Sequence, residues 1–142
     1  MNVINETPGL EEFVELRFAA GAEPVSHQAL KNGLDHSVYV ATVRDERSVL
    51  IGTGRIIGDG GCYYQIVDLF IHPDQKEHGL EEVILSNLLD FLHEYASADA
   101  TIMVMSDVAG MKWYQKQGFK LVYPDYYGMT RKVGRHSAIS DI

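Results

Sequence analysis

The spacing of hydrophobic positions changes along the chain, and each spacing predicts a different element. In residues 10–18, apolar side chains recur at intervals of three and four positions, which is typical of an amphipathic helix. Thr7 and Pro8 precede this segment and predict its start, since threonine caps helices and proline favours their first turn. A second, shorter helix is expected to begin at Pro24 or Ser26.

The apolar period then shortens to two, which predicts strands. Residues 37–43, 49–57 and 63–71 alternate or run apolar, as extended chains with one or two buried faces do. A charged turn at residues 44–47 separates the first two segments. The sequence Gly-Asp-Gly-Gly at residues 58–61 separates the second and third, and it is a strong hairpin signal. These segments predict a three-stranded antiparallel meander.

The strongest helical pattern follows the meander. Residues 80–95 carry a continuous apolar stripe at i, i+3 and i+4, and residues 101–105 are apolar except at their first position. Such a short run is typical of a strand that is buried on both faces beside a parallel neighbour. Strand, helix and strand predict a right-handed βαβ unit. The expected fold class is therefore α+β, with a mixed, mostly antiparallel sheet and one central βαβ unit.

The last part of the chain predicts further elements and one boundary. A short helix is expected over residues 108–117, and a last pair of strands over residues 119–123 and 129–133. A length of 142 residues suggests one domain. We expect this domain to span residues 1–133 and a flexible tail without pattern to follow at residues 134–142.

Composition narrows the function classes. With 20 acidic and 12 basic residues the formal net charge is −8, which argues against a nucleic-acid partner. The charge fits a cationic small molecule weakly, and solubility alone explains it equally well. The lone cysteine, Cys62, excludes an internal disulfide and a zinc site built from cysteines. The sequence shows no leader pattern and no run of about 18 apolar residues, so we expect a cytoplasmic protein with no membrane partner.

The predicted topology places a ligand site before any motif is considered. In an open α/β arrangement a ligand binds at the carboxyl end of the strand that enters a βαβ unit, here near residue 71. The next predicted helix begins near Gly79, and its free backbone N–H groups and positive dipole end suit a phosphate. An unrelated nucleotide or phosphate binder would use the same feature, so topology alone leaves the function open.

A first motif lies at this strand end. Residues 68–81 resemble the fourth strand and following loop of the GNAT superfamily of N-acetyltransferases, in which a hydrophobic-x-Pro turn leads into Q/R-x-x-G-x-G/A. Lys76 occupies the Gln/Arg position, Gly79 the first glycine and Glu81 the second Gly/Ala position. Lysine is a mild departure from the family pattern, since it still donates to phosphate.

A second motif supports the resemblance. Residues 107–119 look like the family pattern N-x-x-A-x-x-x-Y-x-K-x-G-F, with Asp107 in place of the asparagine. The part Tyr-x-Lys-x-Gly-Phe, residues 114–119, matches in full. The resemblance covers residues 39–133. On these motifs the chain is identified as a small, single-domain bacterial member of the family.

The resemblance implies a cofactor site. Acetyl-CoA would lie between the splayed fourth and fifth strands, with its pantetheine paired to residues 63–71 like an added strand. Its pyrophosphate would rest on the backbone N–H groups of the following loop. The cofactor-binding residues that the resemblance implies are Phe70, Ile71, Lys76, Glu77, His78, Gly79, Leu80, Glu81, Asp107 and Tyr114.

The resemblance also implies a reaction, the direct attack of a primary amine on the thioester without an acyl-enzyme. Tyr114 occupies the position of the family's general acid, which protonates the departing thiolate. Strand alternation would place Ile66, Asp68 and Phe70 on one face, which makes Asp68 a candidate base acting through water. A reaction with no protein base is the alternative.

The acceptor is less well marked. We expect a small amine such as an amino acid, polyamine, amino sugar or aminoglycoside. Candidate contacts to it are Arg17, His27, His36, Arg55, Tyr64 and Tyr126. No metal is expected, because the six histidines show no recognisable ligand spacing. Homodimers are frequent in the family, which leaves the oligomeric state open.

Glu81 is the serious departure from the family pattern. A carboxylate about 4 Å from a pyrophosphate costs about 1–4 kcal/mol, depending on the local dielectric. The same carboxylate stabilises the helix whose first turn it occupies. The sequence therefore predicts weakened acetyl-CoA binding. A second hypothesis follows from it, a GNAT-fold binding or regulatory protein without catalysis.

Overall fold

The structure, a computed structural model, describes residues 2–134 apart from the side chains of Glu77 and His78. Residues up to Met105 form one compact unit, and a second unit begins at Ser106. Residues 135–142 of the predicted tail lie outside the described residues. That residues 1–133 act as a single domain stays a prediction.

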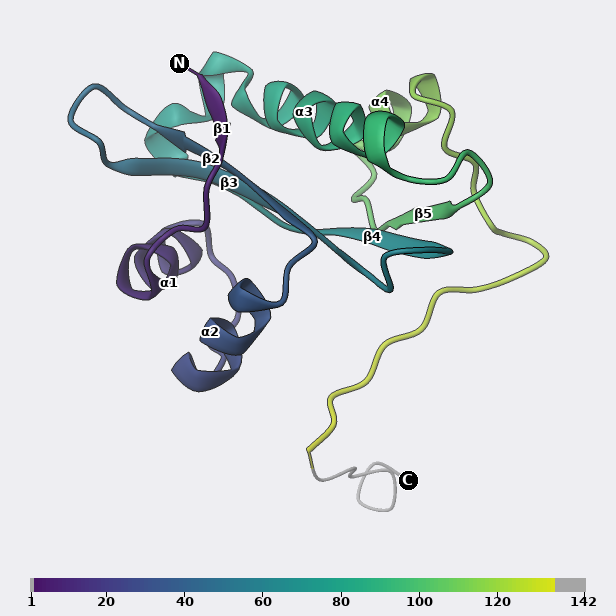
Figure 1. Cartoon of the computed structure of the whole chain (residues 1–142), viewed down its shortest axis with the longest axis horizontal. Helices are drawn as coiled ribbons and strands as arrows, with labels where there is room; N and C mark the ends of the chain where they lie inside the picture. The colour runs from purple at the N-terminus through teal and green to yellow at the C-terminus, as the bar shows by residue number, and fades with distance from the viewer. Residues whose placement is uncertain (1, 135–142) are drawn as a thin grey trace. The chain divides into compact units, whose positions relative to one another are not determined.

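The first unit is built on a five-stranded sheet. Its strands are β1 (Val3–Asn5), β2 (Tyr39–Arg44), β3 (Leu50–Gly58), β4 (Tyr63–Ile71) and β5 (Thr101–Val104). They lie side by side in chain order, with β1 to β4 antiparallel and β5 parallel to β4 (Figure 1). The predicted α+β fold with a mixed sheet is confirmed.

Helices cover both faces of this sheet. α1 (Leu10–Ala19) and α2 (His27–Asp35) lie on one face and α3 (Leu80–Tyr95) on the other (Figure 1). A short 3-10 helix, η1 (Pro73–His78), leads from β4 into α3, which completes the predicted βαβ unit. No helix within residues 2–134 has the length and apolar character needed to cross a membrane.

Two glycines of β3 allow α3 to lie close to the sheet. A Cβ on Gly54 would stand 2.9 Å from Ile84 Cγ2 and 3.1 Å from Leu88 Cδ1. A Cβ on Gly52 would stand 3.0 Å from Ile84 Cδ1. Real Cβ atoms do not approach a neighbour as closely as the Gly54 contact, so a side chain there would displace Ile84 or the helix that carries it. Ile84 and Leu88 are both fully buried and form the centre of the core on this face.

On the opposite face, α1 and α2 close a second core. Phe13, Leu30 and Leu34 are buried there. The ring of Phe70 on β4 packs edge-on against Phe13, with ring centroids 6.4 Å apart. This core therefore reaches the strand that carries the predicted site.

The helix starts confirm one prediction and correct another. α1 begins after Gly9 rather than at Thr7 and Pro8. The reason is that the Glu12 carboxylate, at the third helical position, accepts the Gly9 N–H at 2.8 Å, which is the half of a capping box that glycine, without a side chain, can take part in. For α2, Ser26 is the N-cap, and its hydroxyl oxygen accepts the Ala29 N–H at 3.1 Å, which confirms the second of the two predicted starts.

The predictions for the last part of the chain are correct only in part. β5 is not buried on both faces, since Met103 is 48% exposed. α4 (Met111–Lys116) forms inside its predicted range. The prediction of a last pair of strands is wrong, because no strand occurs between α4 and residue 134. The chain turns there instead: the Tyr126 N–H donates to the Val122 carbonyl at 2.9 Å, around the turn-forming Pro124.

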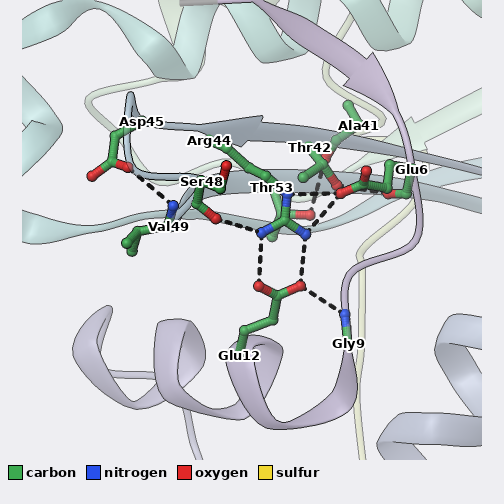
Figure 2. Close-up of polar contacts among 10 residues, drawn as sticks. All are labelled: Glu6, Gly9, Glu12, Ala41, Thr42, Arg44, Asp45, Ser48, Val49 and Thr53. Atoms are coloured by element: carbon green, nitrogen blue, oxygen red, sulfur yellow. Dashed lines mark hydrogen bonds and ion pairs between the residues drawn. The ribbon is translucent and has the colours of Figure 1, made fainter.

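Arg44 on β2 ties α1 and the segment after β1 to the sheet (Figure 2). Its guanidinium binds the two oxygens of Glu12 at 2.7 Å each and one oxygen of Glu6 at 2.7–2.8 Å. It also donates to the Ser48 carbonyl at 3.0 Å, in the turn between β2 and β3. These bonds hold the pKa of the Glu12 carboxyl below its ordinary value of 4.5 and raise the pKa of Arg44.

Glu12→Gln tests this ion pair. Because the pKa of Glu12 is depressed in the folded state, its stabilisation is present above about pH 4.5 and is lost as the pH falls through the lower folded value. The side chains of Arg44 and Glu12 are 23% and 32% exposed, so solvent screens the pair in part. We expect the free energy of unfolding to fall by about 1–2 kcal/mol at pH 7 and the difference to shrink at an acid pH, where Glu12 becomes protonated. Urea unfolding at both pH values measures it.

Glu11→Gln is the matched control, since it removes the same charge from the exposed side of the same helical turn. Its stability should stay within about 0.5 kcal/mol of wild type at both pH values. Equal losses in the two variants would contradict the role given to the ion pair.

Candidate functional site

β4 contains a bulge in its middle. The register of β3 against β4 shifts between Thr53 and Arg55, where β4 carries one additional residue. Asp68 lies at this point with a φ of 54°, in the left-handed region that residues with a side chain rarely adopt. A bulge bends its strand and turns the side chains and backbone groups that follow it in a new direction.

The bulge corrects the predicted alternation along β4. Ile66 pairs with Ile56, whose neighbour Arg55 points to the opposite face of the sheet. Asp68 contacts the Arg55 side chain and therefore lies on the face of α1 and α2. Phe70 packs against α1 on that face as well. The prediction that Ile66 shares a face with Asp68 and Phe70 is wrong.

The Asp68 carboxylate is held by two arginines from different elements. Arg55 on β3 donates from Nε to one oxygen at 2.7 Å, and Arg17 on α1 donates from Nη1 to the other at 3.3 Å. Arg55 also donates to the Gly33 carbonyl at 3.0 Å and to Ser37 Oγ at 2.9 Å, in and just after α2. One carboxylate thus connects α1, α2, β3 and β4.

Arg17 lies over two aromatic rings as well. Its Cζ atom is 5.1 Å from the ring centroid of Phe70 and 5.8 Å from that of Phe13, within the range of cation–π attraction. Its Nη2 donates to the Glu23 carbonyl at 3.0 Å. These contacts fix the arginine beside β4.

This cluster bears on two of the predicted roles. Arg17 and Arg55, both candidate acceptor contacts, are brought together at the bulge. Asp68, the candidate base, has both oxygens engaged by guanidinium groups, and its role as a base stays a prediction. The sequence alone does not indicate these ion pairs, because the partners of Asp68 are 51 and 13 positions away in the chain.

The other candidate acceptor contacts come from β4, from α2 and from the second unit. Tyr64 is buried on β4, at 6% exposure. His27 and His36 are exposed at the two ends of α2, where His36 Nδ1 is 2.7 Å from the Asn32 carbonyl oxygen. Tyr126 is exposed in the second unit. Among the described residues no group of three or more histidine, cysteine or acidic side chains could hold a metal ion.

Beyond the bulge, β4 has a free edge toward β5. The pairing of the two strands runs from Tyr63 opposite Thr101 to Ile66 opposite Val104, where β5 ends. β4 continues to Ile71, so the segment with Phe70 and Ile71 has a strand neighbour on the β3 side alone within the described residues. Backbone groups on such an edge can pair with an extended ligand.

The same strand leads to the start of α3. Gly79 is the N-cap residue, with a φ of 67°, and it has no side chain with which to cap the helix. The following residues divide by exposure: Leu80 is buried, and Lys76, Glu81 and Glu82 are exposed. The predicted contacts from the side chains of Glu77 and His78 lie outside what the structure describes.

The second unit holds the other predicted residues. Tyr114 on α4 is 8% exposed, and its ring is held edge-on by Trp113 and Phe119, with centroids 5.3 and 5.5 Å away. Asp107 is exposed and accepts the Gly110 N–H at 2.8 Å. The sequence places Asp107 in a motif, and the structure adds that it closes the turn before α4.

Comparisons with known proteins agree with this architecture. The profile of a family described as acetyltransferase (GNAT) domain matches residues 10–129. Among curated proteins, an uncharacterized N-acetyltransferase, ycf52, of Pyropia yezoensis is 32% identical over 93 residues. That match covers 64% of this chain and 51% of the relative, so the chain spans about half the length of the curated relatives it matches.

Solved structures extend the likeness to nearly the whole chain. A probable acetyltransferase of unknown function from methicillin-resistant Staphylococcus aureus has a TM-score of 0.83 at 30% identity, with 92% of this chain and 98% of that chain covered. A GNAT-family acetyltransferase from Streptococcus pneumoniae has a TM-score of 0.74 at 20% identity, with 94% and 98% covered. The second likeness shows the fold alone.

Asp68→Asn tests whether one carboxylate organises the bulge. Without its charge, two largely buried guanidinium groups lose their counter-ion. We therefore expect the free energy of unfolding to fall by about 2–4 kcal/mol. Urea unfolding followed by circular dichroism measures the loss.

Asp35→Asn is the control, because it removes the same charge from an ion pair with Lys31 whose side chains are 50% and 57% exposed. It should cost less than about 0.5 kcal/mol. If both variants lose equally little, the carboxylate at the bulge has no special structural role.

Proposed function

This chain belongs to the GNAT acetyltransferase family, and we propose that it transfers an acetyl group from acetyl-CoA to the primary amine of a small molecule. The family implies an acyl-CoA cosubstrate. The observation that supports the proposal most strongly is the free edge of β4. It begins where pairing with β5 stops and leads toward the uncapped start of α3 at Gly79.

The residues of the first unit fit this cosubstrate. Beyond the bulge, Phe70 and Ile71 offer backbone groups to an extended chain, as in strand addition. The proposed pyrophosphate loop runs from Glu77 through His78, Gly79 and Leu80 to Glu81. A Cβ built on Gly79 would have nothing within 4 Å, so the backbone there is open to close approach.

Charge and backbone groups at this loop are suited to phosphate. The first N–H groups of α3 have no acceptor within their own helix, and the helix dipole is positive at this end. The ammonium group of Lys76, which is exposed, adds a donor. When bound, acetyl-CoA supplies the acyl thioester that the amine attacks.

Tyr114 is proposed as the general acid. In this role its hydroxyl donates a proton to the sulfur as the thiolate departs. Its support is its place in the Tyr-x-Lys-x-Gly-Phe motif and a ring locked between two aromatic neighbours, since a proton donor acts best when packing fixes its orientation. Asp107, also proposed near the pantetheine, is itself fixed by the Gly110 N–H.

Two roles are open for Asp68. As a base acting through water, it would accept the proton of the attacking amine. As an ion-pair partner, it would hold Arg17 and Arg55 in place, and its contacts with both arginines support this second role. An amine that arrives neutral needs no protein base.

A second candidate function is a GNAT-fold binding or regulatory protein without catalysis. Glu81 and Glu82 favour it, because both carboxylates lie exposed in the first turn of α3, beside the proposed pyrophosphate. Release of thiol from acetyl-CoA across a panel of amines separates the two functions. Measurable binding of CoA with no thiol release for any amine would favour the second.

Tyr114→Phe tests the general acid. We expect kcat to fall at least about a hundredfold with the best amine of the panel, while KM for acetyl-CoA changes little, because the lost proton matters only in the transition state. Thiol release gives both constants. Tyr95→Phe, which removes a hydroxyl from a tyrosine that is 68% exposed on α3, should leave kcat unchanged. A kcat for Tyr114→Phe within about twofold of wild type would rule out the acid role.

Glu81 substitutions test the cost of a carboxylate beside the pyrophosphate. Glu81→Gln removes the charge and Glu81→Gly also removes the side chain, so the pair separates repulsion from obstruction. We expect acetyl-CoA to bind at least about fivefold more tightly to either variant, since a like charge at about 4 Å in water is worth about 1 kcal/mol. Calorimetric Kd values measure this. Glu94→Gln, the same charge change at the far end of α3, should keep the wild-type Kd, and equal Kd values for all four proteins would overturn the prediction.

A further inference from the structure

The ion-pair cluster at the bulge carries more positive than negative charge. Among the ion pairs of the described residues, Arg17 and Arg55 share the single carboxylate of Asp68, which leaves one positive charge in excess. The three side chains are 12%, 14% and 18% exposed, so water solvates this excess only in part. The further contacts described for the two arginines are with neutral oxygens and, for Arg17, with aromatic rings.

The two arginines are engaged to different degrees. Arg55 makes three bonds of 2.7–3.0 Å to Asp68, Gly33 and Ser37, which join strands to α2. Arg17 makes a longer bond to Asp68, at 3.3 Å, and one to the Glu23 carbonyl at 3.0 Å. A guanidinium has five N–H donors, so Arg17 has capacity for a further oxygen ligand.

Arg17 also lies beside β4, the strand proposed to bind the cosubstrate. Its guanidinium lies over the ring of Phe70, on the part of β4 that follows the bulge and has the free edge. An acceptor amine that meets a thioester held along this edge would come close to the same residues. Any anionic group on that acceptor would then find a poorly solvated, unbalanced guanidinium.

We propose that Arg17 binds an anionic group of the acceptor, and hence that the acceptor class is a primary amine that also carries a carboxylate or a phosphate. The inference rests on the proposed acetyl transfer and names its substrate class. Planar guanidinium groups match both anions in geometry and charge. The net charge of −8 fits a cationic acceptor weakly, and the local excess at the bulge has the opposite sign.

Four amines with one shared skeleton test the proposal. β-Alanine, O-phosphoethanolamine, ethanolamine and ethylenediamine each carry an amine two carbons away from a carboxylate, a phosphate, a hydroxyl or a second amine. Thiol release from acetyl-CoA gives kcat/KM for each. We expect at least one anionic amine to exceed both ethanolamine and ethylenediamine by about tenfold or more, and the better of the two anions identifies the group.

Substitutions assign the preference to one residue. Arg17→Gln should lower kcat/KM for the preferred anionic amine far more than kcat/KM for ethanolamine, so that the two values lie within about threefold of each other, whereas Arg17→Lys should keep part of the preference. Arg47→Gln removes the same charge from an exposed arginine in the turn between β2 and β3 and should keep the full preference. The thermal midpoint of each variant confirms that it is folded.

A binding measurement separates this inference from the proposed function. The Nε–H signal of Arg17 in an NMR spectrum, assigned by its loss in Arg17→Gln, should shift with β-alanine or O-phosphoethanolamine and not with ethanolamine. If the Arg17 signal shifts while no amine releases thiol, the anion-binding role of Arg17 is supported and the proposed acetyl transfer is contradicted. A preference for ethanolamine or ethylenediamine, an equal loss for all four amines in Arg17→Gln, or an Arg17 signal that no anionic amine moves would each overturn the inference.

Discussion

The ion pairs of Asp68 are the constraint on which the candidate site depends. A non-glycine residue with a φ of 54° inside a strand is costly by itself, and such conformations persist when their surroundings hold them. Here the surroundings are Arg55 on the neighbouring strand and Arg17 on the covering helix. The same contacts turn Asp68 and Phe70 toward α1. The direction of β4, the closure of α1 over the sheet and the placement of the arginines are therefore consequences of one carboxylate.

The net charge of this chain does not show how its charges are distributed among the individual sites. The bulge has an excess of positive charge, although the chain as a whole is strongly acidic. The start of α3 carries two exposed carboxylates beside the proposed pyrophosphate loop. Glu6 and Glu12 share the single guanidinium of Arg44, which leaves one negative charge in excess, and the pairing acts in folding. Local pairing, and not net charge, decides what each region of the surface can bind.

Much of the fold follows from local pattern, and the rest does not for physical reasons. β4 and α3 have their predicted bounds, because their apolar periods are long and end at clear turn residues. The start of α1 is set by a Glu12 side chain that reaches back to Gly9, a competition with Thr7 that propensity alone does not resolve. The strands expected after α4 do not form, because residues with strand propensity need a neighbouring strand to pair with. The chain there makes a turn with its own backbone hydrogen bond instead.

The candidate site is predictable to a different extent. The motif residues from Lys76 to Glu81 and at Tyr114 are visible in the sequence, because they are consecutive or closely spaced. The bulge is not visible, because it is defined by pairing with β3, and a single inserted residue reverses every face that follows. Arg17 illustrates the limit. Its role comes from the joint placement of Asp68 and Phe70, which the fold alone brings together.

Gly52 and Gly54 have an effect that extends beyond the core they complete. Because they lack side chains, α3 can lie close to the sheet, and the first residue of this helix directly follows Gly79. The distance between helix and sheet therefore helps to position the backbone N–H groups at the start of α3. Substitutions at these two buried glycines can therefore change the affinity for a phosphate, although neither residue contacts a ligand. A search for mutations that alter this affinity has to include Gly52 and Gly54 as well as the loop.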